Sequence, residues 1–214
     1  MRISIMQPYF YPYLGYFRLF SEVDLFVIYD CVQFPRDGWV HRNKLTDRSG
    51  DLAWLKLPLN KLPLKTVIGD LTFSPDSRSQ MLFQLQKFEI FEKIAPEDID
   101  LLLDTRISVI DYLESHLRLV AQKLSFEVQM FRSSKLEIDP QIKGQSRVLE
   151  IVKSLGGTQY INLSGGRELY DSETFEAKGV QLKFLKPYKG NGISMLERLQ
   201  NENVDALIHE VNSD

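Results

Sequence analysis

The stretch that decides the fold is Met6-Gln7-Pro8-Tyr9-Phe10-Tyr11-Pro12-Tyr13-Leu14-Gly15-Tyr16-Phe17, which joins a strand-like start to a helix-like run. The alternating segment Ile3–Ile5 precedes it, and residues 15–23 after it read as a short helix. Residues 25–29 are a near-continuous β-branched and aromatic run, typical of a strand buried on both faces of a parallel sheet. The order predicts a βαβ unit whose polar, aromatic turn lies where open α/β sheets bind ligands.

The remaining chain also alternates between strand-like and helix-like segments. Residues 39–45 and 53–57 predict a hairpin, and residues 67–73 predict another strand. Helical periodicity over residues 75–125 predicts two or three helices, as a helical cap within a single domain of residues 1–214. The later expected elements are strands at 126–131, 160–161 and 180–185, a helix at 145–155 ended by Gly156-Gly157, and a helix capped by Ser194. We therefore expect an α/β fold with a Rossmann-like open, mostly parallel sheet and a helical insertion.

Composition disfavours several classes of protein. The net charge of −3 argues against generic DNA binding through a wide basic face. No apolar stretch reaches the roughly 20 residues of a membrane span, and no signal-peptide pattern begins the chain, so we expect a cytoplasmic protein. The single cysteine, Cys31, reads as a buried thiol, and no spacing of His and Cys indicates a metal site. No cofactor motif is present, and the cofactor is unknown.

The aromatic turn is the first candidate binding element. Its rigid prolines, Gly15 and several phenols favour a ligand site that includes Gln7, Tyr9, Tyr13 and Tyr16, because buried phenol hydroxyls need hydrogen-bond partners. The alternative is plain packing of the rings over the sheet edge. The free N–H groups at the start of the following helix suit a phosphate or carboxylate.

A second cluster follows the second strand. Asp30 lies where an open sheet presents side chains to a ligand, and Arg42 suits a bidentate grip on phosphate. Gln33 and Asn43 belong to the same cluster and are counted with the binding residues. The alternatives are that Asp30 caps a turn and that Arg42 is a solvated or salt-bridged strand residue. His41 alternates with Arg42 across the strand, so the two cannot both face one small site, and a structural or surface role for His41 is favoured.

A third cluster joins a strand end to a glycine-rich loop. Asn162, Gly165, Gly166 and Tyr170 belong to it, and the adjacent glycines expose N–H groups that suit an anion. A simple turn is the alternative interpretation.

Taken together, residues 7–17, 24–30, 32–34 and 42–43, with the segment 160–171, resemble the WbqC-like protein family. The resemblance implies a bacterial protein encoded among genes for O-antigen or other surface polysaccharides, and a glycine transferase role on an amino sugar has been proposed for some members. This chain departs from the family pattern at Cys31, where members commonly repeat an aspartate.

A second resemblance concerns Pro12–Tyr16, which occupies the strand-to-helix position of the His-x-Gly-His motif of nucleotidylyl transferases. Tyrosine there donates a hydrogen bond but brings no positive charge.

The leading hypothesis is a glycine (acyl) transferase that acts on a nucleotide-linked amino sugar. Asp30 would be the catalytic base, the Gly165-Gly166 backbone would hold an oxyanion or phosphate, and Arg42 would grip the diphosphate. The glycine donor would be an aminoacyl-tRNA or glycine activated by a nucleoside triphosphate. The alternatives are a nucleotidylyl transferase and a non-catalytic sugar-nucleotide-binding protein.

Overall fold

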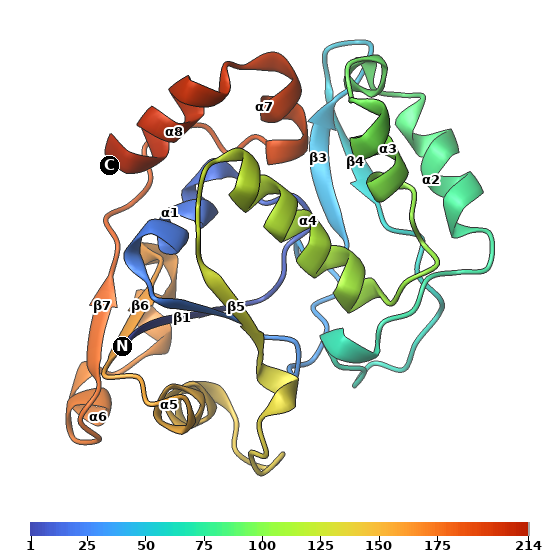
Figure 1. Ribbon diagram of the computed structural model, residues 1–214. Coiled ribbons are helices and arrows are strands. Elements are labelled where there is room, and N and C mark those ends of the chain that lie inside the picture. Colours follow the sequence, from blue (N-terminus) through green and yellow to red (C-terminus); the bar gives the residue numbers. More distant parts are fainter. Residues whose placement is uncertain (214) are drawn as a thin grey trace.

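The computed structural model describes residues 1–213, and a five-stranded parallel sheet forms its centre (Figure 1). The strands are β1 (Arg2–Met6), β2 (Leu25–Ile28), β5 (Gln129–Arg132), β6 (Gln159–Asn162) and β7 (Gln181–Phe184). Their spatial order is β5-β2-β1-β6-β7, and every neighbouring pair is parallel. Counted along the chain, this is the doubly wound order of Rossmann-type sheets. The expectation of an open α/β sheet is confirmed.

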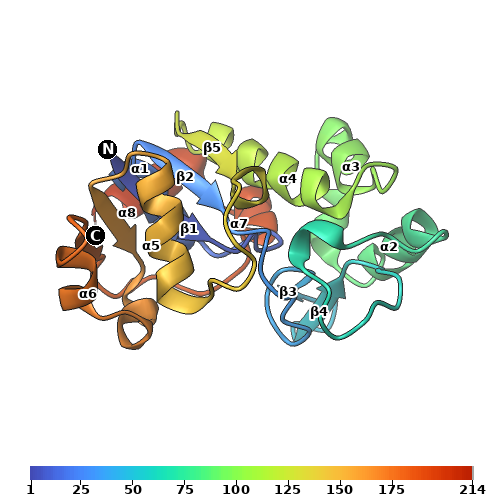
Figure 2. The same ribbon diagram turned by 90° about the horizontal axis from the view of Figure 1, so that it is seen from below.

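Helices cover both faces of the sheet (Figures 1 and 2). One face carries α1 (Leu14–Glu22), α7 (Met195–Asn201) and α8 (Val204–Ser213), and Phe26 and Ile28 of β2 point into this core. The other face carries α5 (Gly144–Ser154) and α6 (Ser172–Glu176), against which Ile3, Ile5 and Val27 pack. Successive side chains of β2 point to opposite faces of the sheet, and helices bury both faces. The sequence of β2 is therefore apolar throughout.

The segment between β2 and β5 forms an insertion beside the sheet (Figure 2). It holds a hairpin of β3 (Arg42–Thr46) and β4 (Leu52–Lys56), followed by η1 (Ile68–Asp70), α2 (Ser77–Leu85), η2 (Glu89–Glu92), α3 (Pro96–Leu102) and α4 (Val109–Lys123). The expected hairpin and helices are therefore present. Leu45 and Leu55 of the hairpin belong to the same buried cluster as Phe17 of α1, so the insertion shares its core with one face of the sheet.

One predicted strand is wrong. Within residues 67–73 the structure has the short helix η1 (Ile68–Asp70) between two isolated bridges, Gln33 with Val67 and Leu59 with Phe73. The N–H of Gly69 donates to the carbonyl of Asp30 at 2.8 Å, and that of Ile68 donates to Val32 at 2.9 Å. These bonds bend the segment around the end of β2. Its β-branched side chains therefore pack against neighbouring residues, and its backbone does not pair as a strand.

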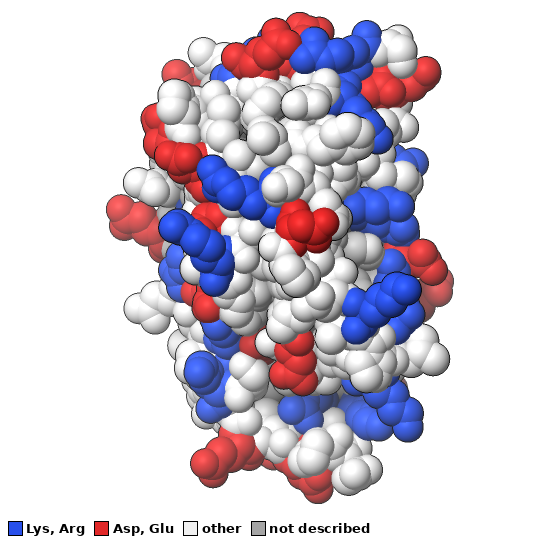
Figure 3. All heavy atoms as spheres, turned by 90° about the vertical axis from the view of Figure 1, so that its right-hand side faces the viewer, with Lys and Arg blue, Asp and Glu red and all other residues white. Residues whose placement is uncertain are grey.

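Figure 3 shows the side of the molecule on the right of Figure 1, where Lys and Arg are interspersed with Asp and Glu. That side carries no extended field of one sign. Within residues 1–213, none of the helices is both long enough and apolar enough to cross a bilayer.

The aromatic turn is pinned from two sides. The Asn43 side chain on β3 donates to the carbonyls of Phe10 and Tyr11, at 2.9 and 2.7 Å. The hydroxyl of Ser194, which also caps α7, donates to the Tyr11 carbonyl at 2.9 Å. Tyr11 has a φ of 44°, a left-handed conformation that is uncommon outside glycine and costs free energy. The hairpin and α7 together hold this turn in place.

His116 of α4 packs against the same turn. Its ring lies 4.9 Å from the ring of Tyr11, its Nδ1 donates to the Tyr112 carbonyl at 2.7 Å, and its Nε2 is buried without a partner among the described residues. Burial lowers the pKa of His116 to about 4, so the folded state keeps the ring neutral.

We expect His116 to make the fold sensitive to acid. An unfolded histidine binds a proton below about pH 6.5, so stability falls as the pH falls from there toward 4, by about 2 kcal/mol at pH 5. His116→Leu removes this part of the slope when urea unfolding is compared at pH 7 and pH 5. The exposed His209 provides the control His209→Leu, and equal slopes in wild type and His116→Leu would contradict the assignment.

Candidate functional site

A cavity of about 660 Å³ lies at the carboxyl ends of β1 and β6. Met6 and Gln7 line it from the end of β1, and Asn162 and Ser164 line it from the end of β6. The chain leaves β1 toward α1 on one face of the sheet, whereas it leaves β6 toward α6 on the other. The cavity therefore occupies the topological switch point, where open α/β sheets bind their ligands.

Aromatic and uncharged polar side chains make up most of the cavity wall. Trp39 and five half-buried tyrosines line it, namely Tyr9, Tyr13, Tyr29, Tyr170 and Tyr188. Arg18 and Lys186 supply positive charge, and none of the described lining residues is Asp, Glu or His. Such a wall suits a ligand that combines flat or sugar rings with an anionic group.

The phenols of the wall are hydrogen-bond donors at neutral pH. Burial raises the pKa of Tyr9, Tyr13 and Tyr29 above the ordinary value of tyrosine. Tyr16 stands behind them: it is fully buried, its hydroxyl donates to the Gln7 carbonyl at 2.9 Å, and its ring lies 5.6 Å from that of Tyr9. Tyr16 therefore supports the wall and does not form its surface.

Arg18 and Lys186 were missed in the sequence reasoning. Arg18 on α1 is only 5% exposed, and its Nη1 donates to the Lys186 carbonyl at 2.8 Å, which ties the segment after β7 to α1. The side chain of Lys186 is exposed and has no hydrogen-bond or ion-pair partner among residues 1–213. A charged residue within the otherwise buried, apolar run Leu14–Phe20 was the available signal for Arg18.

Gly15 fixes the contact between two rings of the wall. A Cβ on Gly15 would lie 2.4 Å from the Tyr13 ring and 2.6 Å from the Tyr188 ring, whose centroids are 5.6 Å apart. The Tyr188 hydroxyl in turn contacts Glu210 and accepts from Arg198 at 3.2 Å. Tyr188, which the sequence reasoning also missed, is thus positioned by α1, α7 and α8 together.

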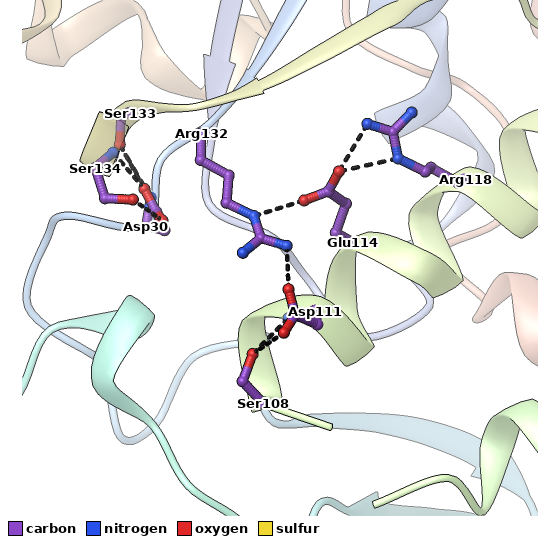
Figure 4. A network of polar contacts seen from close by, with 8 residues as sticks. All are labelled: Asp30, Ser108, Asp111, Glu114, Arg118, Arg132, Ser133 and Ser134. Atoms are coloured by element: carbon purple, nitrogen blue, oxygen red, sulfur yellow. Dashed lines mark hydrogen bonds and ion pairs between the residues drawn. The ribbon is translucent and has the colours of Figure 1, made fainter. Parts of the chain in front are cut away.

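Asp30 lies outside the cavity lining. Figure 4 shows its carboxylate facing Ser133 and Ser134. It is 1% exposed, and its carboxylate accepts from the Ser133 hydroxyl at 2.9 Å and from the Ser134 N–H and hydroxyl at 2.8 and 2.6 Å. Because β2 lies between β1 and β5, the carboxylate turns toward β5 and away from the switch point. This placement fits the alternative in which Asp30 stabilises a turn.

The predicted site residues divide into three groups by their placement. Those that line the cavity are Gln7, Tyr9, Tyr13, Asn43, Asn162, Gly165, Gly166 and Tyr170. Those that support the wall from behind are Gly15 and Tyr16. Those outside the lining are Asp30, Gln33 and Arg42.

The residues outside the lining have structural partners. Gln33 donates to the Leu64 carbonyl at 2.9 Å, and Arg42 donates to the Asp37 carbonyl at 2.6 Å. Cys31 is half-buried, and its sulfur accepts from Nε of Arg147 at 3.2 Å, so it is not the apolar-like buried thiol that we expected.

The glycine-rich segment is more ordered than a simple loop. Ser164–Leu169 forms the short helix η4, and a Cβ on Gly166 would lie 2.6 Å from the Asn162 amide. Gly166 therefore allows β6 and η4 to approach closely. Anion binding by this backbone stays a prediction.

The family model described as "WbqC-like protein family" matches residues 7–191 of this chain. An uncharacterised protein of Mycobacterium tuberculosis, Rv1507c, is 21% identical over 189 residues, which cover 85% of this chain and 80% of that protein. No solved structure matches the chain significantly.

Asp30→Asn tests whether this carboxylate is structural. In the variant, the amide N–H₂ would face groups of Ser133 and Ser134 that now donate hydrogen bonds to the carboxylate. We therefore expect a loss of about 1–3 kcal/mol in the free energy of unfolding. Ligand affinity at the cavity should stay within about twofold of wild type, as measured by calorimetry. Loss of a measured activity with unchanged stability would instead restore Asp30 as the catalytic base.

Gly15→Ala should damage the cavity although alanine favours helices. The added methyl group has to displace the Tyr13 or Tyr188 ring, so ligand affinity should fall by about tenfold or more. Glu22→Ala, an exposed change on the same helix, is the matched control. Equal affinities of the two variants would show that these rings do not shape the site.

Proposed function

Because the chain belongs to the WbqC-like protein family, we propose that it transfers a glycyl or other small acyl group onto a nucleotide-linked amino sugar in surface polysaccharide biosynthesis. The observation that carries this proposal is the cavity at the switch point, whose described lining residues combine phenols and two cations and include no carboxylate. A nucleotide-linked sugar pairs a diphosphate with sugar and base rings, and a wall free of negative charge does not repel it.

The ligand parts match different sections of the wall. Arg18 and Lys186 attract the diphosphate, and the guanidinium is held in place by its bond to the Lys186 carbonyl. Tyr9, Tyr13 and Tyr170 offer ring faces and hydroxyls to the sugar. Asn162 keeps its amide N–H₂ for the ligand or for η4, because its Oδ1 already accepts from the Leu163 N–H at 2.8 Å.

Acyl transfer at this site rests on orientation and on hydrogen bonding. The amine of the sugar attacks an activated carbonyl carbon, the new C–N bond replaces the bond to the leaving oxygen, and that oxygen takes up the amine proton. Protonated phenols of the wall donate hydrogen bonds to the carbonyl oxygen as negative charge develops there. Holding amine and carbonyl in contact supplies the remaining acceleration.

A non-catalytic sugar-nucleotide-binding protein is the second candidate. The lack of Asp, Glu and His among the described lining residues favours it, since no ordinary general base faces the ligand. Turnover separates the two candidates. Incubation with UDP-glucosamine, glycine and ATP, or with glycyl-tRNA, yields a glycylated sugar nucleotide by mass spectrometry only if the protein is a transferase.

Lys186→Ala tests the binding step directly. We expect UDP-glucosamine to bind the wild type, and the variant to bind about tenfold more weakly in low salt, because a cation next to the diphosphate is lost. Lys183→Ala on β7 removes an exposed lysine that does not line the cavity and should bind like wild type. Calorimetric titration measures both variants. Absence of binding to any nucleoside-diphosphate sugar, or equal affinities of the variants, would contradict the proposed site.

A further inference from the structure

The two tryptophans of this chain lie together, one in the loop before the hairpin and one within it. The sequence contains two, Trp39 just before β3 and Trp54 within β4, and their ring centroids are 5.4 Å apart. Trp39 is 42% exposed, an unusual placement for so large an apolar side chain.

Two cations lie over the Trp54 ring. The Arg42 guanidinium lies 4.4 Å from the centroid of the Trp54 ring, and the Lys44 ammonium lies 5.1 Å from it. In the hairpin register Lys56 is opposite Arg42, and Lys44 is opposite Trp54. All four side chains therefore belong to one side of the hairpin, because residues alternate between its faces. We call Trp39, Arg42, Lys44, Trp54 and Lys56 the tryptophan face.

The other side of the hairpin is buried. Asn43 and Leu45 of β3 and Leu55 of β4 have at most 4% exposure and pack toward the core. Lys56 is exposed and Lys44 half-buried, and neither has a carboxylate partner among the described residues. The tryptophan face is thus the solvent side of a hairpin whose opposite side is fixed.

The surroundings of the tryptophan face are electropositive. Burial together with the nearby charges of Arg42 and Lys56 lowers the pKa of His41 to about 4. Asp37, which lies 3.5 Å from Arg42, is 99% exposed and screens the cations weakly, and the Glu197 carboxylate next to this side of β3 accepts from the Thr46 hydroxyl at 2.7 Å. In a chain of net charge −3, this is a local excess of positive charge.

The tryptophan face continues into the cavity. Trp39 contacts Trp54 on one side and lines the cavity on the other. Arg42 donates to the carbonyls of Asp37 and Gly38, and the Trp39 carbonyl accepts from the Phe10 N–H at 2.9 Å. The loop that carries Trp39 is therefore fixed between the hairpin and the aromatic turn.

We propose that the tryptophan face binds single-stranded RNA and places its acyl-bearing 3′ end at the cavity. Bases stack on exposed aromatic rings whatever their sequence, while neighbouring cations contact the phosphates. This inference rests on the proposed function, since it names the acyl donor as an aminoacylated RNA. In the transfer the sugar amine forms a C–N bond to the ester carbonyl, the ester C–O bond breaks, and the ribose oxygen leaves with the amine proton.

A membrane surface is the competing partner for a patch of tryptophan and lysine. The tryptophan face favours RNA because the Trp54 ring lies beside the cations of Arg42 and Lys44 and because Trp39 leads into a cavity for a second substrate. Membrane binding needs a wide apolar surface around the tryptophans. Among the described residues of β3 and β4, Leu52 is the one large apolar side chain that is exposed, so this surface is small.

The experiment uses the full chain and a labelled 12-nucleotide RNA that ends in CCA. Because both tryptophans belong to the tryptophan face, stacking of bases should quench the intrinsic tryptophan fluorescence as the anisotropy of the RNA rises. In 50 mM salt the double change Lys44→Ala and Lys56→Ala should weaken binding about tenfold, and it should reduce the salt slope by about 1.4. The control double change Lys153→Ala and Lys178→Ala removes the same charge from exposed sites on α5 and after α6.

The outcomes separate this inference from the proposed function. RNA binding that is equal in the two double variants, binding without tryptophan quenching, or binding of anionic vesicles in place of RNA would overturn it. UDP-glucosamine is titrated in parallel, and its affinity should not change in the Lys44 and Lys56 variant. Failure of that titration in wild type contradicts the proposed function but leaves the RNA result interpretable. If the double variant does not fold, the single change at exposed Lys56 replaces it, with an expected loss of about threefold.

Discussion

The structure depends on the hydrogen bonds that hold the turn after β1. Asn43 and Ser194, which are far apart in the sequence, donate to carbonyls of this turn and fix Tyr11 in a left-handed conformation. Both donors are buried, so each bond forms where water cannot replace it. Through Asn43 the insertion becomes attached to the sheet, and through Ser194 the C-terminal helices do. These bonds add to the buried cluster that the hairpin and α7 share with α1.

The same constraint determines what the cavity can bind. The turn directs Tyr9 and Tyr13 into the wall, while α1, which follows it, contributes Arg18. The strand ends contribute amides and backbone, and the carboxylate of Asp30 is bound by Ser133 and Ser134 on the far side of β2. A site of donors, rings and positive charge results, which is complementary to an anionic, ring-bearing ligand and poor in general bases.

The sequence predicted the sheet and most helices because their signals are local. Alternation at Ile3 and Ile5 and the apolar run of β2 depend only on neighbouring residues. The strand expected at 67–73 was wrong because tertiary bonds to the backbone around Asp30 override its β-branched pattern. The position of Asp30 was also misjudged for a tertiary reason. Asp30 follows β2, and the strand order places β5 on the side of β2 away from the switch point, where Asp30 finds its partners. Lys186 and Tyr188 join the wall through contacts with α1, α7 and α8 that no local pattern encodes.

We propose that the switch-point cavity is the sugar-nucleotide site. A crystal structure of the protein with UDP-glucosamine tests it most directly. We expect the diphosphate within hydrogen-bond distance of Arg18 or Lys186 and the sugar ring against Tyr9, Tyr13 or Tyr170. A ligand bound elsewhere on the molecule, with the cavity filled by solvent alone, would contradict the claim.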